Sequence, residues 1–180
     1  AQLVQFLTTG RTEHTAVFGG MSDVIVQSMQ YMTDDDLTAI ARYLKTLPGT
    51  TYNETPFKYD DAAYNALYNG DDSAVGASVY VDNCAACHRT DGKGYAEVFP
   101  AFTGNPVLLG NDATSLIHIV LKGDTLPSTF KAPTSYNMPA FDTRLTDKQV
   151  ADVVNFIRNS WGNQASPVTE KQVADVRSDV

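Results

Sequence analysis

Two cysteines and a histidine lie close together near the middle of the chain, in the run Cys84-Ala85-Ala86-Cys87-His88. The spacing C-x-x-C-H is typical of covalent c-type haem attachment. Two thiols on one helical turn can each reach a vinyl group of the same porphyrin, and the adjacent imidazole can bind the iron from one face. The motif therefore predicts one c-type haem, held by Cys84, Cys87 and His88.

Two other kinds of site use the same residue types. A thioredoxin-like dithiol site needs the cysteine pair at the start of a helix that follows a β-strand, and the sequence shows no strand pattern of that kind. A zinc site needs two further soft ligands, but the chain has no other cysteine, and His14 and His118 are distant in the sequence. Haem attachment is favoured over both, and a dithiol oxidoreductase without haem stays as an alternative.

An iron bound by a histidine on one face has a second axial position, which the thioether of Met commonly fills in electron carriers. Of the four methionines, only Met138 follows the motif, and Pro139 stiffens the backbone beside it. Tyr136 and Phe141 can shield the haem edge from water. We therefore predict that His88 and Met138 are the iron ligands. The alternative is that Met138 only fills space in the core.

The surrounding sequence extends the motif. Taken with Asp91-Gly92-Lys93-Gly94, Phe99-Pro100-Ala101-Phe102 and Met138-Pro139, it resembles a class I cytochrome c domain. The resemblance implies an all-α fold of short helices around one covalently bound haem. In that family a proline about a dozen residues after the haem histidine offers its carbonyl to the second ring nitrogen. Pro100 stands twelve positions after His88, so it is expected to fix the tautomer and orientation of that ring.

Hydrophobic periodicity predicts the helices that must position these residues. A helix capped by Ser73 would carry Val79 and Tyr80 into the motif. A second helix covers residues 113–123 and ends at Gly123, with His118 expected on its surface or in packing. A third helix begins at Thr146-Asp147, and we expect it to pack against the first. Its apolar positions are Val150, Val153, Val154, Ile157 and Trp161.

The last of these helices has a counterpart near the N-terminus. The segment that begins at Thr33-Asp34 repeats the pattern that follows Thr146, and Met21 precedes it as Met138 precedes the later copy. The early copy lacks a haem motif, so Met21 would need a haem from elsewhere to act as a ligand, and it is otherwise an apolar packing residue. The simplest expectation is that the chain begins inside a larger multihaem polypeptide.

These observations divide the chain into four parts. Residues 1–48 are expected to be the C-terminal part of a preceding cytochrome c-like domain, and residues 49–72 a connector with enough apolar surface to lie along a domain face. Residues 73–163 are expected to form the complete cytochrome c domain, and residues 164–180 a short terminal helix or strap. A partial domain has lost part of its core, so the first part must pack on the intact domain, associate with another chain or stay loose.

Over nearly the whole chain, the sequence resembles the C-terminal part of the three-haem cytochrome c subunits of periplasmic alcohol, gluconate and aldehyde dehydrogenases. The matching stretches include Phe6-Leu7-Thr8-Thr9-Gly10-Arg11, Gln30-Tyr31-Met32-Thr33-Asp34 and Ser160-Trp161-Gly162-Asn163. The resemblance implies an electron-transfer subunit, not an enzyme, in the bacterial periplasm. It would pass electrons from a dehydrogenase catalytic subunit toward quinone or a terminal oxidase.

Composition narrows the remaining partners. The 13 basic and 21 acidic residues give a net charge of −8, which disfavours nucleic acid and anionic lipid surfaces. No apolar run approaches the roughly 18 residues of a membrane span, so membrane association would require partners or missing segments.

With both axial positions filled, the iron would carry single electrons. The alternative is a haem enzyme or gas sensor whose sixth iron position is open.

Overall fold

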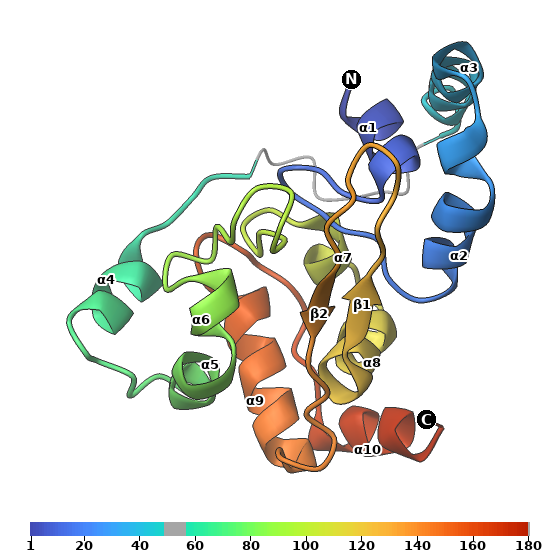
Figure 1. Cartoon of the computed structure of the whole chain (residues 1–180). Helices are drawn as coiled ribbons and strands as arrows, with labels where there is room; N and C mark the ends of the chain where they lie inside the picture. The colour runs from blue at the N-terminus through green and yellow to red at the C-terminus, as the bar shows by residue number, and fades with distance from the viewer. Residues whose placement is uncertain (49–56, 180) are drawn as a thin grey trace.

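The computed structural model describes residues 1–48 and 57–179. Its fold is helical apart from one small antiparallel sheet, and it confirms the expected class (Figure 1). The elements are α1 (Gln2–Thr9), α2 (Gly20–Gln27), η1 (Met29–Tyr31), α3 (Asp34–Leu44), α4 (Ala62–Tyr68), α5 (Ala77–Asn83), α6 (Ala85–His88), α7 (Pro106–Leu109), α8 (Thr114–Lys122), β1 (Asp124–Leu126), β2 (Tyr136–Met138), α9 (Asp147–Arg158) and α10 (Glu170–Ser178).

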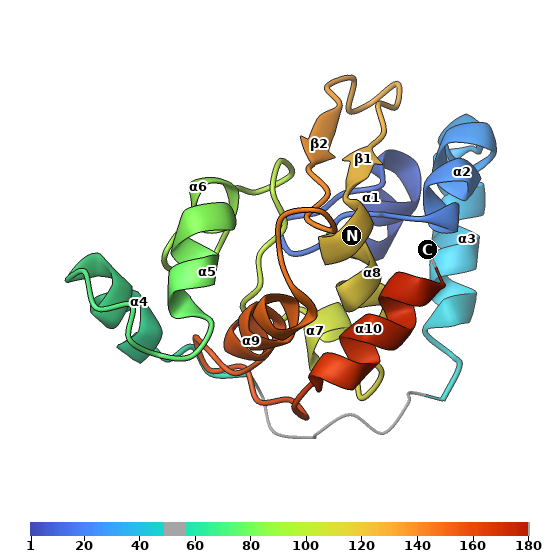
Figure 2. The same ribbon diagram turned by 90° about the horizontal axis from the view of Figure 1, so that it is seen from below.

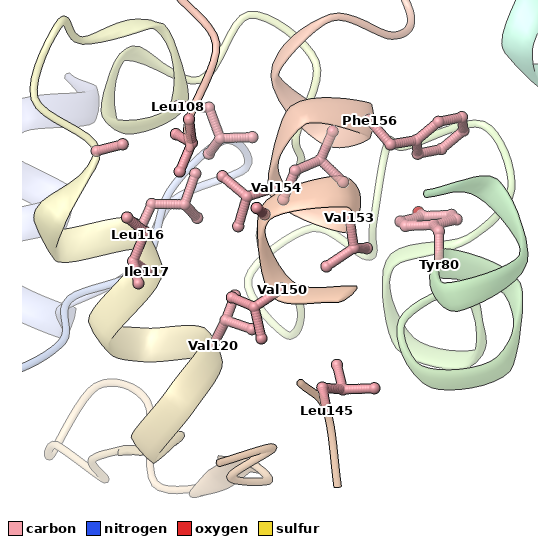
Figure 3. Packing of buried hydrophobic residues seen from close by; sticks show 14 of the residues in the cluster. Tyr80, Leu108, Leu116, Ile117, Val120, Leu145, Val150, Val153, Val154 and Phe156 are labelled. Atoms are coloured by element: carbon pink, nitrogen blue, oxygen red, sulfur yellow. The ribbon is translucent and has the colours of Figure 1, made fainter. Parts of the chain in front are cut away.

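Helix α9 is the centre of the main core. It begins with a capping box, in which the Thr146 hydroxyl accepts from the Gln149 N–H and the Gln149 side chain returns to the Thr146 backbone. Helices α5, α8 and α10 pack around it, as Figures 1 and 2 show from two directions. In Figure 3, Val150 and Val154 lie toward α8, while Val153 lies toward Tyr80 of α5. The predicted packing of this helix against the first is confirmed.

The helix before the motif begins later than its sequence predicts. Ser73 does not cap it, because the Ser73 hydroxyl donates to Asp71 Oδ1 at 2.6 Å, and the helix starts at Ala77 after Gly76. Tyr80 is fully buried, and its hydroxyl donates to the carbonyl of Arg89 just after the motif. The helix therefore still fixes the motif against the core, although its predicted cap was wrong.

The hairpin of β1 and β2 carries the predicted methionine. Asp124 pairs with Met138, and Leu126 with Tyr136. The chain after β2 is fastened to the end of α8, because the Phe141 N–H lies 3.1 Å from the Leu121 carbonyl oxygen. The hairpin thus grows directly out of the core helix, and the position of Met138 follows from that of α8.

The N-terminal part packs on the hairpin side of the molecule, where α1 lies beside the hairpin in both views (Figures 1 and 2). Helix α3 begins after Thr33, where the repeated pattern begins. The Thr33 hydroxyl accepts from the Asp36 N–H, and Leu37 is buried. By contrast, Tyr43 and Leu44 are exposed, whereas their counterparts in α9 are buried. Of the three arrangements expected for residues 1–48, the structure shows packing on the rest of the chain. That these residues are the last part of another cytochrome c-like domain stays a prediction.

The two other predicted parts also contact the central domain. The first eight connector residues, 49–56, lie outside the described ranges; beyond them, the Tyr59 hydroxyl donates to the Asp91 carbonyl at 3.2 Å. At the C-terminus, Val173 of α10 is fully buried, and Arg177 pairs with Asp147 at 2.6 Å. The exact domain boundaries stay predictions. Among the helices of residues 1–48 and 57–179, none has the length and apolarity needed to cross a membrane.

Candidate functional site

A deep, largely apolar cavity opens beside the C-x-x-C-H motif. The space that it encloses, together with its open mouth, is about 1220 Å³. All four predicted site residues, Cys84, Cys87, His88 and Met138, line it. The other wall residues include Thr15, Ala16, Val17, Phe18, Phe99, Pro100, Phe102, Leu116, Val120, Asp124, Tyr136, Phe141, Val153 and Ile157. The structure thus brings together the four predicted site residues, which the sequence separates by up to 54 positions.

The ring of His88 is held in one orientation. Its Nδ1 donates to the Pro100 carbonyl oxygen at 3.0 Å, which is the bond that the family resemblance implies. That bond leaves Nε2 as the nitrogen with a free lone pair. Burial lowers the pKa of His88 to about 4, although the bond to Pro100 opposes the shift. His88 is therefore neutral at pH 7, in the protonation state that binds a metal.

The two thiols do not have the surroundings of a redox-active pair. Cys84 precedes α6 and Cys87 lies within it, both partly buried and neither in a disulfide. Burial raises the pKa of Cys84 to about 12, with a smaller contribution from Cys87, so its reactive thiolate is scarce at neutral pH. Helix α5, not a strand, comes before them. These features disfavour the dithiol alternative.

The zinc alternative finds no support either. Within residues 1–48 and 57–179, no three His, Cys, Asp or Glu side chains gather in a way that could hold a metal ion. His118 lies exposed on α8, which is one of the two placements expected for it. The motif therefore has no additional protein ligands for a zinc ion.

Met138 reaches the cavity from β2, and the aromatic residues predicted beside it line the same space. The Tyr136 ring packs edge-on against Phe99, with ring centroids 5.7 Å apart. Met21, in contrast, is 38% exposed on α2 and is not among the cavity residues. Within this chain, Met138 is thus the methionine positioned to meet a group bound at the motif.

Sequence reasoning missed one wall of the cavity. Residues 15–18 have no motif or periodicity, yet they line the cavity because Val17 bonds back to Gly10 and packs with Ile25 and Leu126. Only the tertiary packing of the N-terminal part brings this segment to the motif, so no local signal could have found it.

Asp124 was also missed as a cavity residue. Its Oδ2 accepts from the Gly19 N–H and its Oδ1 from the Thr125 N–H, each at 2.6 Å. Both carboxylate oxygens are therefore engaged by backbone amides. This places Asp124 in a structural role that joins the hairpin to the N-terminal part.

Comparison with known proteins identifies the class. Residues 73–161 match the family model described as "Cytochrome c". This segment, which contains the motif, Pro100 and Met138, is a cytochrome c domain.

The chain as a whole is related to the cytochrome c subunits of dehydrogenases. It is 57% identical to the gluconate 2-dehydrogenase cytochrome c subunit of Pantoea cypripedii, over 98% of this chain and 41% of that protein. It is 48% identical to the cytochrome c subunit of alcohol dehydrogenase (quinone) of Gluconacetobacter polyoxogenes, over 96% and 37%. The corresponding subunit of Gluconobacter oxydans is 47% identical, over 91% and 34%.

The chain spans about two fifths of the length of these curated relatives. Their names, which describe cytochrome c subunits, agree with the sequence-based prediction of an electron-transfer subunit.

Proposed function

We propose that this chain is a single-electron carrier with one c-type haem, bound covalently through Cys84 and Cys87, with His88 and Met138 as the axial ligands of the iron. The observation that carries this proposal is that all four residues line one cavity in which His88 Nδ1 is already bonded to Pro100. The donor set fits the group, because it supplies two free thiols, a neutral imidazole and a thioether. When bound, the haem supplies reversible one-electron chemistry.

The chain's own residues prepare this site. Pro100 fixes the His88 tautomer, and the ring of Phe102 stacks on the imidazole with centroids 4.2 Å apart and planes at 18°. The apolar wall excludes water from the cofactor, and a methionine ligand favours a high reduction potential. Each of these effects suits a carrier that accepts electrons late in a chain.

The proposed partners are a dehydrogenase catalytic subunit as the electron donor and a quinone or terminal oxidase as the acceptor, in the bacterial periplasm. The support comes from the names of the relatives and from covalent haem attachment, which resembles periplasmic maturation. The net charge of −8 suits a partner with a basic docking surface. Such docking should weaken as salt rises, because surface charges are screened.

An open sixth position for an enzyme or sensor receives less support. General acid–base chemistry would need a titratable group free to face the iron. Asp124 lines the cavity, but its carboxylate oxygens already accept two backbone N–H bonds. Tyr136 and Asn137 are the other polar residues beside Met138, and neither is a carboxylate or an imidazole.

The test is a haem count and a visible spectrum on the full chain after maturation with haem. We expect one haem per chain that survives denaturation, together with the weak long-wavelength band of Met-to-iron ligation in the oxidised form. Cys84→Ala with Cys87→Ala should lose the covalent link. A protein that binds cyanide or CO rapidly and lacks the methionine band would instead support the open-site alternative.

A further inference from the structure

Arg11 is a buried arginine that comes from outside the cytochrome c domain. It follows α1 in the N-terminal part, and only 3% of its surface is exposed. Its Nη2 donates to the carbonyl oxygens of Pro127 at 2.7 Å and Thr134 at 2.9 Å, and its Nη1 donates to that of Glu97 at 3.4 Å. One guanidinium thus joins three carbonyls that lie at least 86 positions away in the sequence.

Those carbonyls belong to the two segments that position the proposed iron ligands, Met138 and His88. Pro127 directly follows β1 and Thr134 shortly precedes β2, so Nη2 ties together the two legs of the hairpin that carries Met138. Glu97 lies three positions before Pro100, whose carbonyl holds His88. Arg11 therefore connects the β1–β2 hairpin, which carries Met138, with the loop that contains Glu97 and Pro100, which contacts His88.

The charge of Arg11 is also close to the cavity wall. Its guanidinium carbon lies 5.5 Å from the ring centroid of Tyr136, and that ring lines the cavity. Across the described ranges, no carboxylate lies within ion-pair distance of Arg11, and the Glu97 side chain interacts with its charge from farther away. Arginine keeps its charge in proteins, so a positive charge of low solvent exposure stands behind one wall of the site. A buried charge acts more strongly than an exposed one because water screens it less.

We propose that Arg11 is a positioning residue that holds the Met138 hairpin on the iron and raises the reduction potential of the haem. Both effects have a direct cause: the carbonyl bonds restrain the hairpin, and a nearby positive charge opposes the extra positive charge of the oxidised haem. The inference rests on the proposed ligation by His88 and Met138. It makes the N-terminal part a component of the electron-transfer site.

The experiment compares the haem-loaded full chain with Arg11→Gln and Arg11→Lys. Gln removes the charge, whereas Lys keeps the charge but loses the planar fork that reaches three carbonyls. We expect Arg11→Gln to have a lower midpoint potential, a weaker methionine band and about tenfold tighter cyanide binding. Arg11→Lys should recover part of the potential but little of the resistance to cyanide. For a one-electron couple, a tenfold change in the underlying equilibrium corresponds to about 59 mV.

Arg144→Gln is the matched control. Arg144 stacks at the same 5.5 Å on the ring of Phe141, which also lines the cavity, but its side chain is exposed and donates to Asn83. The control should keep the wild-type potential and cyanide affinity. Equal shifts in Arg144→Gln and Arg11→Gln, or no shift in either Arg11 variant, would overturn the role of Arg11.

The wild-type spectrum separates this inference from the function on which it rests. If the wild-type protein shows the methionine band and the Arg11 variants match it in potential and cyanide binding, only the role of Arg11 is overturned. If the wild-type protein lacks the band, ligation by Met138 is overturned, and the positioning role with it.

Discussion

The rings of His88 and Phe102 stack face to face, with centroids 4.2 Å apart and planes inclined by 18°. Phe102 in turn stacks on Trp161 and meets Tyr80 edge-on, each with centroids 6.2 Å apart. His88 is thus held by an aromatic cluster on one face and by Pro100 at Nδ1. This cluster links the helix core to the proposed ligand, so the orientation of the ligand depends on core packing.

The first prediction concerns this stack. Phe102→Leu keeps an apolar side chain but loses the ring contacts, which contribute about 0.5–1.5 kcal/mol per pair. We expect it to lower the free energy of unfolding by about 2 kcal/mol, because Phe102 is 8% exposed and contacts three rings. Thermal denaturation measures the effect. Phe130→Leu is the control, since Phe130 is 72% exposed and contacts one ring, that of Tyr31, so it should cost only about 0.5–1 kcal/mol.

The second prediction distinguishes the methionines. Met138→Ala should abolish the long-wavelength methionine band, lower the midpoint potential and allow exogenous ligands to bind, because the thioether is lost while the covalent haem links remain. Visible spectroscopy and redox titration measure these changes. Met21→Ala should leave all three properties as in the wild type, since Met21 lies exposed on α2 away from the cavity. The opposite pattern would make Met21 the ligand.

Local patterns in the sequence were sufficient for the helices and for the motif. The apolar residues of α8 and α9 repeat at helical spacing. Helix α8 begins and ends within one residue of the predicted range 113–123, and α9 begins after Thr146 as predicted, but it ends at Arg158, so Trp161 lies beyond the helix in which it was expected. These helix patterns depend on interactions between near neighbours, which a linear sequence records. The contact of Pro100 with His88, by contrast, was expected from the resemblance to the cytochrome c family, and the structure shows it.

The contribution of the N-terminal part could not be predicted in this way. Arg11 and residues 15–18 meet the cytochrome c domain through contacts that span up to about 120 positions, and neither has a distinctive pattern. The cap of α5 was wrong for a related reason: Ser73 bonds to Asp71, so its hydroxyl is already engaged before the helix begins. Competition between local polar partners decides a cap, and the preference of one residue type does not.

The third prediction concerns Gly123, which ends α8 with φ of 64° and ψ of −174°. A Cβ at this position would lie 2.2 Å from the Met138 carbonyl oxygen, and that backbone would have to move. We expect Gly123→Ala to cost at least about 2 kcal/mol in stability and to weaken the methionine band. Gly70→Ala is the control, because Gly70 also has positive φ, at 78°, but has nothing within 4 Å of its Cβ position. It should lower stability by only about 1 kcal/mol and leave the band unchanged.

The fourth prediction concerns the pH dependence of stability through Tyr80, whose hydroxyl bonds to the Arg89 carbonyl. Burial raises the pKa of Tyr80 well above its usual value of 10.0. Above pH 10 the unfolded chain releases this proton while the folded chain keeps it, so stability falls by up to about 1.4 kcal/mol per pH unit from this group alone.

Tyr80→Phe removes both the hydrogen bond and the titrating group. At pH 7 the variant should be less stable than the wild type by about 1 kcal/mol, because the Arg89 carbonyl loses its donor. Between pH 10 and pH 11 the difference should shrink to zero or reverse, since only the wild type loses stability through Tyr80. Denaturant unfolding at pH 7, 9, 10 and 11 measures this crossing. Tyr43→Phe is the control, because Tyr43 is 65% exposed, and its free energy of unfolding should match that of the wild type at each pH. If Tyr80→Phe differed from the wild type by the same free energy at all four pH values, Tyr80 would not keep its proton in the folded chain.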